Sequence, residues 1–132
     1  MILLDTHVWI KWVNADGSLN ADEQNGLDAL STQGRMFLSD ISLWEVQMLS
    51  KRPDSPVIGT LEAWFERATS SDLFQIQPIT VEVANELNRL PESFHKDPAD
   101  RIITATARVL EVPLATHDRD IIKSGAVLIW RP

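Results

Sequence analysis

Short apolar runs, separated by segments with helical spacing, constrain the fold of this chain more than any other feature. Three such runs occur, at Ile2–Leu4, Met36–Leu38 and Val112–Ala115. Each is too short to hold as an isolated helix, so each is predicted to be a buried strand. Strands that alternate with helices favour an α/β fold with a parallel sheet.

The segments between these runs carry helix signals. Helices are predicted over His7–Val13, Ala21–Thr32, Ser39–Arg52, Thr60–Thr69, Thr80–Leu90, from Pro98 to Leu110, and around Ile121–Ile122. The expected caps are Ser18 or Asn20, Thr80 and Asp97. Two further strands are predicted at Phe74–Ile79 and Val127–Trp130. The sheet should therefore have four or five strands.

Two expectations concern large apolar side chains. In the segment from Ser39 to Arg52, Ile41, Trp44 and Met48 share one helical face, which should be the buried one. Of the five tryptophans, Trp12 and Trp64 are expected to serve an interface with a partner.

The composition excludes several classes of protein. A chain of 132 residues is expected to form one domain, residues 1–132. There is no cysteine, which excludes disulfide scaffolds, thiolate zinc sites and cysteine nucleophiles. No two glycines lie closer than eight residues, so a phosphate-cradling loop is not expected. No signal peptide or membrane span is recognised, so a cytoplasmic location without membrane association is expected.

The net charge of −7 argues by itself against nucleic-acid binding, unless the surplus carboxylates are gathered in one place. Asp5 directly follows the first predicted strand, and Glu45 lies in the first turns after the second. Asp118 follows the strand that ends at Ala115, and Asp100 opens the helix before that strand. Ligands of open α/β sheets bind at the carboxyl ends of strands. These four acids are therefore predicted to lie together.

Carboxylates at close range repel each other, so such a cluster needs a cation. Mg²⁺ and Mn²⁺ prefer carboxylate and water oxygens, and two such ions would offset the four charges. Without the four acids the net charge would be about −3, which no longer argues against a phosphate substrate.

Four segments of the chain resemble the motifs of the PIN-domain family, and in particular VapC-like toxins of toxin–antitoxin pairs. They are Ile2–His7, Leu38–Glu45, His95–Arg101 and Leu114–Asp118. The resemblance covers essentially the whole chain in the right order and spacing. It implies a three-layer PIN-like fold, divalent-metal endoribonuclease activity on RNA, a homodimer and a protein antitoxin.

The resemblance places the acidic quartet of the family on Asp5, Glu45, Asp100 and Asp118, as catalytic residues and as ligands of Mg²⁺ or Mn²⁺. Asp97 lies in the same motif as Asp100, but it is better suited to cap the following helix. Asp120 competes with Asp118 for the fourth position.

Other interpretations remain open at this stage. One is a PIN-like module that binds RNA or protein with weak or no nuclease activity. Another is a phosphatase-like or response-regulator-like domain, although no later strand is followed by the lysine that it would need. The histidines lack the spacing of a zinc site; His7 and His117, each within two residues of a quartet acid, are candidates to contact RNA or to support the ligands. Lys11 is among the bases close to the motifs.

Overall fold

Four short parallel strands form the centre of the fold in the computed structural model, which describes all residues from 1 to 132. The strands are β1 (Ile2–Leu4), β2 (Met36–Ser39), β3 (Phe74–Gln77) and β4 (Leu114–Ala115). The helices are α1 (Thr6–Asn14), α2 (Ala21–Thr32), α3 (Ile41–Leu49), α4 (Leu61–Ala68), α5 (Val81–Arg89), α6 (Pro98–Leu110) and α7 (Arg119–Ser124). None of these helices combines the length and apolar character needed to cross a membrane.

The strand order is β3-β2-β1-β4, so β1 lies inside the sheet between β2 and β4. Leu4 pairs with Leu38 on one side and with Ala115 on the other. Because all pairs are parallel, the residues after β1, β2 and β4 emerge at the same edge of the sheet. The predicted α/β class with a small parallel sheet is confirmed.

The predicted last strand, Val127–Trp130, is reduced to one bridge between Leu114 and Ile129. Its partner β4 has only two residues, because Val112, two residues past the end of α6, still donates its N–H to the Ala107 carbonyl of that helix. A strand of two residues offers no room for a longer ladder. The sheet therefore has four strands.

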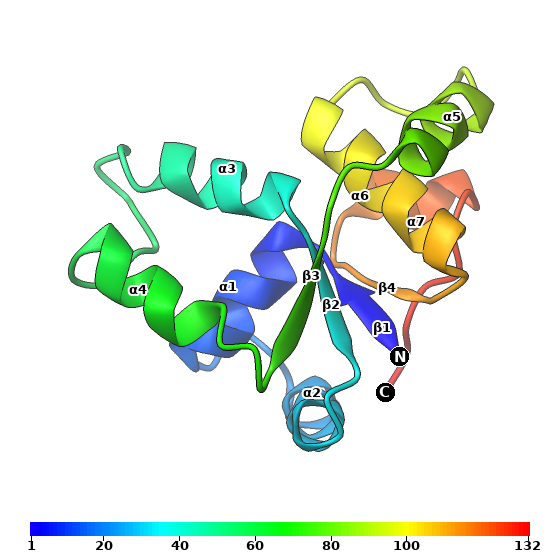
Figure 1. Ribbon diagram of the computed structural model, residues 1–132. Helices are drawn as coiled ribbons and strands as arrows, with labels where there is room; N and C mark the ends of the chain where they lie inside the picture. The colour runs from blue at the N-terminus through cyan, green and yellow to red at the C-terminus, as the bar shows by residue number, and fades with distance from the viewer.

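Helices cover both faces of the sheet (Figure 1). Alternate residues of β1 point to opposite faces, as the pleat of a strand requires. Ile2 and Leu4 pack in a core with the helices α1 to α4, and Leu3 packs in a second core with α5, α6 and α7. The result is three layers, with the sheet between two groups of helices.

Two predictions about large side chains are wrong. On α3 the fully buried residues are Ser42 and Val46, whereas Trp44 is 49% exposed and Met48 40% exposed. Contacts of Ser42 with α1, described below, set the rotation of α3, and sequence spacing does not reveal them. Trp64 is fully buried, with its ring packed edge-on at 5.1 Å from Trp9, so it belongs to the core and not to an interface.

Candidate metal centre

Acidic side chains gather in one cleft at the carboxyl edge of the sheet. The cleft has a volume of about 220 Å³ and no apolar lining residue. Its lining consists of Asp5, His7, Lys11, Glu45, Asp97, Asp100, His117 and Asp118. The structure thus brings the four acids of the predicted quartet together, along with Asp97. Asp120 lies outside, in a separate pocket beside Lys123.

Asp5 lies at the bottom of the cleft and is only 3% exposed. It directly follows the inner strand β1, and it is the N-cap of α1, where Oδ1 accepts a hydrogen bond of 2.9 Å from the Val8 N–H. Its other oxygen, Oδ2, accepts a hydrogen bond from the Thr116 hydroxyl at the end of β4. These two donors hold the buried carboxyl in a fixed orientation.

Glu45 reaches the cleft from α3. The Thr6 hydroxyl donates a hydrogen bond to Glu45 Oε1, and Thr6 Oγ1 also lies 2.8 Å from the hydroxyl of Ser42. Thr6 and Ser42 are both buried, so a pair of hydroxyls connects α1 and α3 beneath the carboxyl. This contact explains why α3 turns Ser42 inward and places Glu45 at the cleft.

Asp97 and Asp100 enter the cleft from the start of α6. Asp97 is the N-cap, as predicted, and its Oδ1 accepts a hydrogen bond of 3.0 Å from the Asp100 N–H. Pro98 occupies the first turn of α6, where a backbone N–H has no partner within the helix. The missing N–H of proline therefore costs no hydrogen bond. Asp100 lies in the first turn of the helix, and no backbone donor engages its carboxyl. It is therefore freer than Asp97 to bind a ligand.

Asp118 is the N-cap of α7, and its Oδ1 accepts a hydrogen bond of 3.0 Å from the Ile121 N–H. Its backbone N–H in turn donates to the hydroxyl of Thr116. The same threonine therefore ties Asp118 to Asp5. A capping role and a place in the cleft coexist in this residue.

Burial raises the pKa of three carboxyls in the cleft, those of Asp5, Glu45 and Asp100, and repulsion by neighbouring acids adds to it for Glu45 and Asp100. Burial is the largest cause for Asp5 and for Glu45, and it outweighs the hydrogen bonds from Thr116 and Thr6 that favour ionisation. The pKa of Asp100 rises to about 7, first through burial and then through the charges of Asp97, Asp118, Glu45 and Asp5. Five carboxyls face one lysine in the cleft. The protein alone thus leaves negative charge without a counter-ion.

These donors fit a hard divalent cation. Carboxylate oxygens are the ligands that Mg²⁺ and Mn²⁺ prefer. Oxygens of Asp100 and Asp118 and a nitrogen of His95 all lie within 4.8 Å of one another, close enough to share one ion after small side-chain movements. The raised pKa of Asp100 points the same way, because a cation would relieve the repulsion that raises it.

His95 lies against these acids, a position that the sequence did not predict. Its Nε2 lies 3.5 Å from Asp100 Oδ2. A histidine five residues before a helix-opening aspartate is a weak signal, and only the path of the loop before α6 brings the two side chains together. The supporting hydroxyls of Thr6 and Thr116 were not predicted either. Thr6 directly follows Asp5, and Thr116 directly follows the strand that ends at Ala115.

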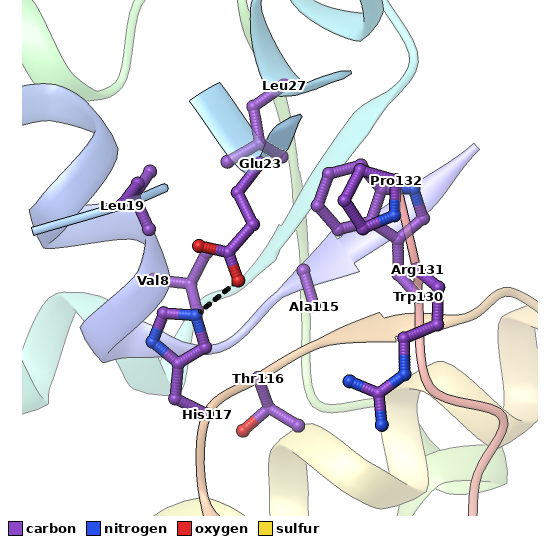
Figure 2. Close-up of a pocket in the computed structure, with 10 residues that line it drawn as sticks. All are labelled: Val8, Leu19, Glu23, Leu27, Ala115, Thr116, His117, Trp130, Arg131 and Pro132. Carbon is purple, nitrogen blue, oxygen red and sulfur yellow. Dashed lines mark hydrogen bonds and ion pairs between the residues drawn. The ribbon is translucent and has the colours of Figure 1, made fainter. Parts of the chain in front are cut away.

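A chain of polar contacts runs from the cleft to α2. Lys11 Nζ lies 3.0 Å from His117 Nδ1, and His117 Nε2 lies 2.7 Å from Glu23 Oε1 (Figure 2). A lysine ammonium only donates, so His117 accepts at Nδ1 and donates from Nε2. Glu23 is fixed by the capping box of α2, where its Oε2 accepts from the Asn20 N–H. This chain holds the Lys11 ammonium at the edge of the cleft.

Comparison with known proteins supplies the family. The model of the PIN domain family matches residues 2–126. No curated protein matches the chain.

Among solved structures, FitAcB from Neisseria gonorrhoeae is similar with a TM-score of 0.71 and 25% identity, covering 100% of this chain and 98% of that one. FitAB bound to an IR36 DNA fragment has a TM-score of 0.72 and 26% identity, covering 98% and 94%. VapBC2 from Rickettsia felis, bound to a DNA fragment from its promoter, shares the fold with a TM-score of 0.72 at 17% identity, covering 98% of both chains. With the family model matched along nearly its whole length, this chain belongs to the PIN-domain family.

Proposed function

We propose that this protein is a metal-dependent endoribonuclease toxin that a protein antitoxin controls. The observation that carries the proposal is the convergence of Asp5, Glu45, Asp100 and Asp118 in one polar cleft at the carboxyl edge of the sheet. The family is one of nucleases, which supports a nuclease rather than a module that only binds. In this proposal the four acids hold Mg²⁺ or Mn²⁺, and Asp97 mainly caps α6.

Each residue has a task that follows from its position. The quartet binds one or two divalent cations, which would supply an activated water for attack on phosphorus and offset negative charge on the phosphate. Thr116 and Thr6 fix the carboxyls of Asp5 and Glu45 by hydrogen bonds, so that these ligands need little reorganisation. Lys11, held by His117, offers its remaining N–H groups to a phosphate oxygen.

The partners in this proposal are RNA, an antitoxin and a second copy of the chain. The solved structures with similar folds support the antitoxin, since one is described as a toxin–antitoxin complex from Klebsiella pneumoniae, with a TM-score of 0.66 and 22% identity, covering 97% of this chain and 96% of that one. The exposed Trp44 and Met48 on α3 support a homodimer, because apolar side chains of this size gain from burial. An RNA substrate in the cell implies a cytoplasmic site of action.

The test combines metal binding with cleavage. Mn²⁺ should raise the melting temperature of the wild-type protein by mass action and should support cleavage of total cellular RNA. The Asp5→Asn/Asp100→Asn variant should lose both effects, and it should fold, since asparagine caps a helix as well as aspartate does. Equal Mn²⁺ stabilisation of the two proteins would remove the cleft as the metal site. Metal binding without cleavage would favour a binding module.

A further inference from the structure

His95 lies beside the acid cleft, where it lines the neighbouring pocket that also contains Asp120, and it brings a nitrogen close to Asp100. Its imidazole side chain is 24% exposed, but its Nε2 atom is buried and has no hydrogen-bond partner. A buried polar atom without a partner is uncommon in folded proteins and calls for an explanation. The Nε2 atom lies 3.5 Å from Asp100 Oδ2, and one nitrogen of the His95 ring lies within 4.8 Å of carboxylate oxygens of both Asp100 and Asp118.

The fold fixes the imidazole in this position. The ring stacks on Phe94 with 4.9 Å between ring centroids and 25° between the planes, and Phe94 is itself buried in the second core. The Arg101 guanidinium lies over the ring of Phe94, 5.9 Å from its centroid, and donates hydrogen bonds to the backbone carbonyls of Phe94 and His95. The imidazole thus stacks on a buried ring, and Arg101 holds the backbone of the same two residues, so His95 is suited to present one nitrogen at a constant place.

The spacing of the two atoms leaves a direct hydrogen bond unmade and is close to the separation of two ligands of one ion. His95 Nε2 and Asp100 Oδ2 are 3.5 Å apart, longer than the usual 2.7–3.2 Å of an N–H···O hydrogen bond. Two neighbouring ligand atoms of one octahedral ion, each about 2.1 Å from it, lie about 3 Å apart. A small movement of either side chain brings the pair to that separation.

We infer that His95 is a metal ligand, together with Asp100 and Asp118, and that it directs the site toward a transition-metal ion such as Mn²⁺ in preference to Mg²⁺. The inference rests on the proposed function, since it takes the cleft to bind a divalent cation. Mn²⁺ shares the preference of Mg²⁺ for oxygen ligands, but as a transition metal it accepts an imidazole nitrogen more readily than Mg²⁺, which keeps its waters and loses them reluctantly. The alternative is that His95 only forms an ion pair with Asp100 and leaves the choice of ion unaffected.

The experiment measures the binding of each ion alone, Mn²⁺ or Mg²⁺, to the full chain by calorimetry. The wild-type protein should bind Mn²⁺ more tightly than Mg²⁺. His95→Gln should lose at least about tenfold in Mn²⁺ affinity, the loss expected even for a supporting partner of a ligand, and much less in Mg²⁺ affinity. His7→Gln is the matched control, because His7 is a histidine that lines the cleft itself but is exposed and lies outside the group of three possible ligands. Its preference for Mn²⁺ should equal that of the wild-type protein.

A second readout needs no variant. Electron spin-echo spectroscopy of Mn²⁺ bound to the wild-type protein should show modulation from a coordinated imidazole nitrogen. Mn²⁺ binding without that modulation, or an unchanged ion preference in His95→Gln, would overturn the role of His95 and leave the proposed function standing. Binding of neither ion by the wild-type protein would instead overturn the proposed function, and the role of His95 with it.

Discussion

Asp100 is the residue at which the fold opposes ionisation most clearly. Burial and four neighbouring acids raise its pKa from 3.8 to about 7, and no backbone N–H caps its carboxyl. Asp97, only three residues earlier, is satisfied by the helix N-terminus that it caps. The two residues look alike in the sequence, yet their surroundings suit them to different tasks. Asp100 is poised for a cation, and Asp97 for the stability of α6.

The pH dependence of stability should reveal this difference. Because the folded protein holds the Asp100 proton up to about pH 7 while the unfolded chain releases it near 3.8, unfolding releases a proton between these values. The melting temperature in EDTA should therefore fall as the pH rises through this window and level off above it. The raised pKa values of Asp5 and Glu45 act in the same direction.

Asp100→Asn is the control for this measurement. The melting temperature of the variant should fall less as the pH rises, and at pH 8 without metal the variant should be more stable than the wild-type protein. A melting temperature that rises through this window, or a fall of the same size in both proteins, would contradict the assigned repulsion.

Substitution by serine should separate the roles of Asp97 and Asp100. Serine caps helices about as well as aspartate, so Asp97→Ser should keep its stability and most of its activity. Asp100→Ser removes a proposed ligand and should lower the cleavage rate by about 100-fold or more, with the fold intact. Circular dichroism and RNA cleavage, measured on the same preparations, check both statements. The opposite pattern would mean that Asp97 is the ligand.

The sequence predicted the acids of the cleft better than the residues that contact them. Asp5, Glu45 and Asp118 could be found because they follow predicted strands, and parallel strands end at one edge of the sheet. His95 and Glu23 could not, because each reaches the site through a tertiary contact with a residue far away in the chain or across a loop. The spacing of apolar residues along the sequence carries no information about such contacts.

At the scale of the elements, caps made most helices predictable. Asn20, Thr80 and Asp97 each accept a hydrogen bond from a backbone N–H of the first turn, as their positions before an apolar stripe indicated. The helix α3 is different, because Asp40 makes no such bond and the buried face holds a serine. The rotation of α3 depends on the contact between Ser42 and Thr6. The spacing of apolar residues therefore predicted the wrong buried face.

The contact between α2 and the end of the chain yields an element-scale prediction. A Cβ atom on Gly26 would lie 2.8 Å from the Trp130 ring and 3.2 Å from Pro132, closer than van der Waals contact allows. Gly26→Ala should therefore destabilise the protein by about 1–3 kcal/mol, as overpacking does, despite the better helix propensity of alanine.

In a Trp130→Ala background the sign should reverse, and Gly26→Ala should stabilise by up to about 1 kcal/mol. Urea unfolding of the four proteins of this cycle measures both effects. Stabilisation by Gly26→Ala in the wild-type background would show that Trp130 does not pack on α2 in solution.

At the scale of the whole molecule, three layers bring residues from all parts of the chain to one edge. Asp5 directly follows the inner strand β1, and the segments after the flanking strands β2 and β4 lead to Glu45 and Asp118. The layers also leave an apolar surface without a partner, since Trp44 and Met48 lie one turn apart on the outer side of α3. This surface is the basis for the proposed homodimer.

A charge on that surface should separate the two copies. Trp44→Asp/Met48→Asp should shift the protein from dimer to monomer in sedimentation experiments, because a buried unpaired carboxylate is costly. Leu128→Asp is the matched control, since Leu128 is also apolar and 71% exposed but lies beyond β4, on another part of the surface. A dimer that persists in the double variant, or a wild-type protein that is monomeric, would reject this surface as the interface.

Analysis of the ends of cleaved RNA tests the central claim most directly. A metal-activated water attacks phosphorus and expels the ribose 3′-oxygen, which leaves a 5′-phosphate and a 3′-hydroxyl. A metal-free ribonuclease that uses histidines drives the 2′-hydroxyl onto the phosphate and leaves a 2′,3′-cyclic phosphate. The account predicts 5′-phosphate ends, made with Mn²⁺ by the wild-type protein, abolished by EDTA and absent with Asp5→Asn/Asp100→Asn. Cyclic phosphate ends that form in the presence of EDTA would contradict it.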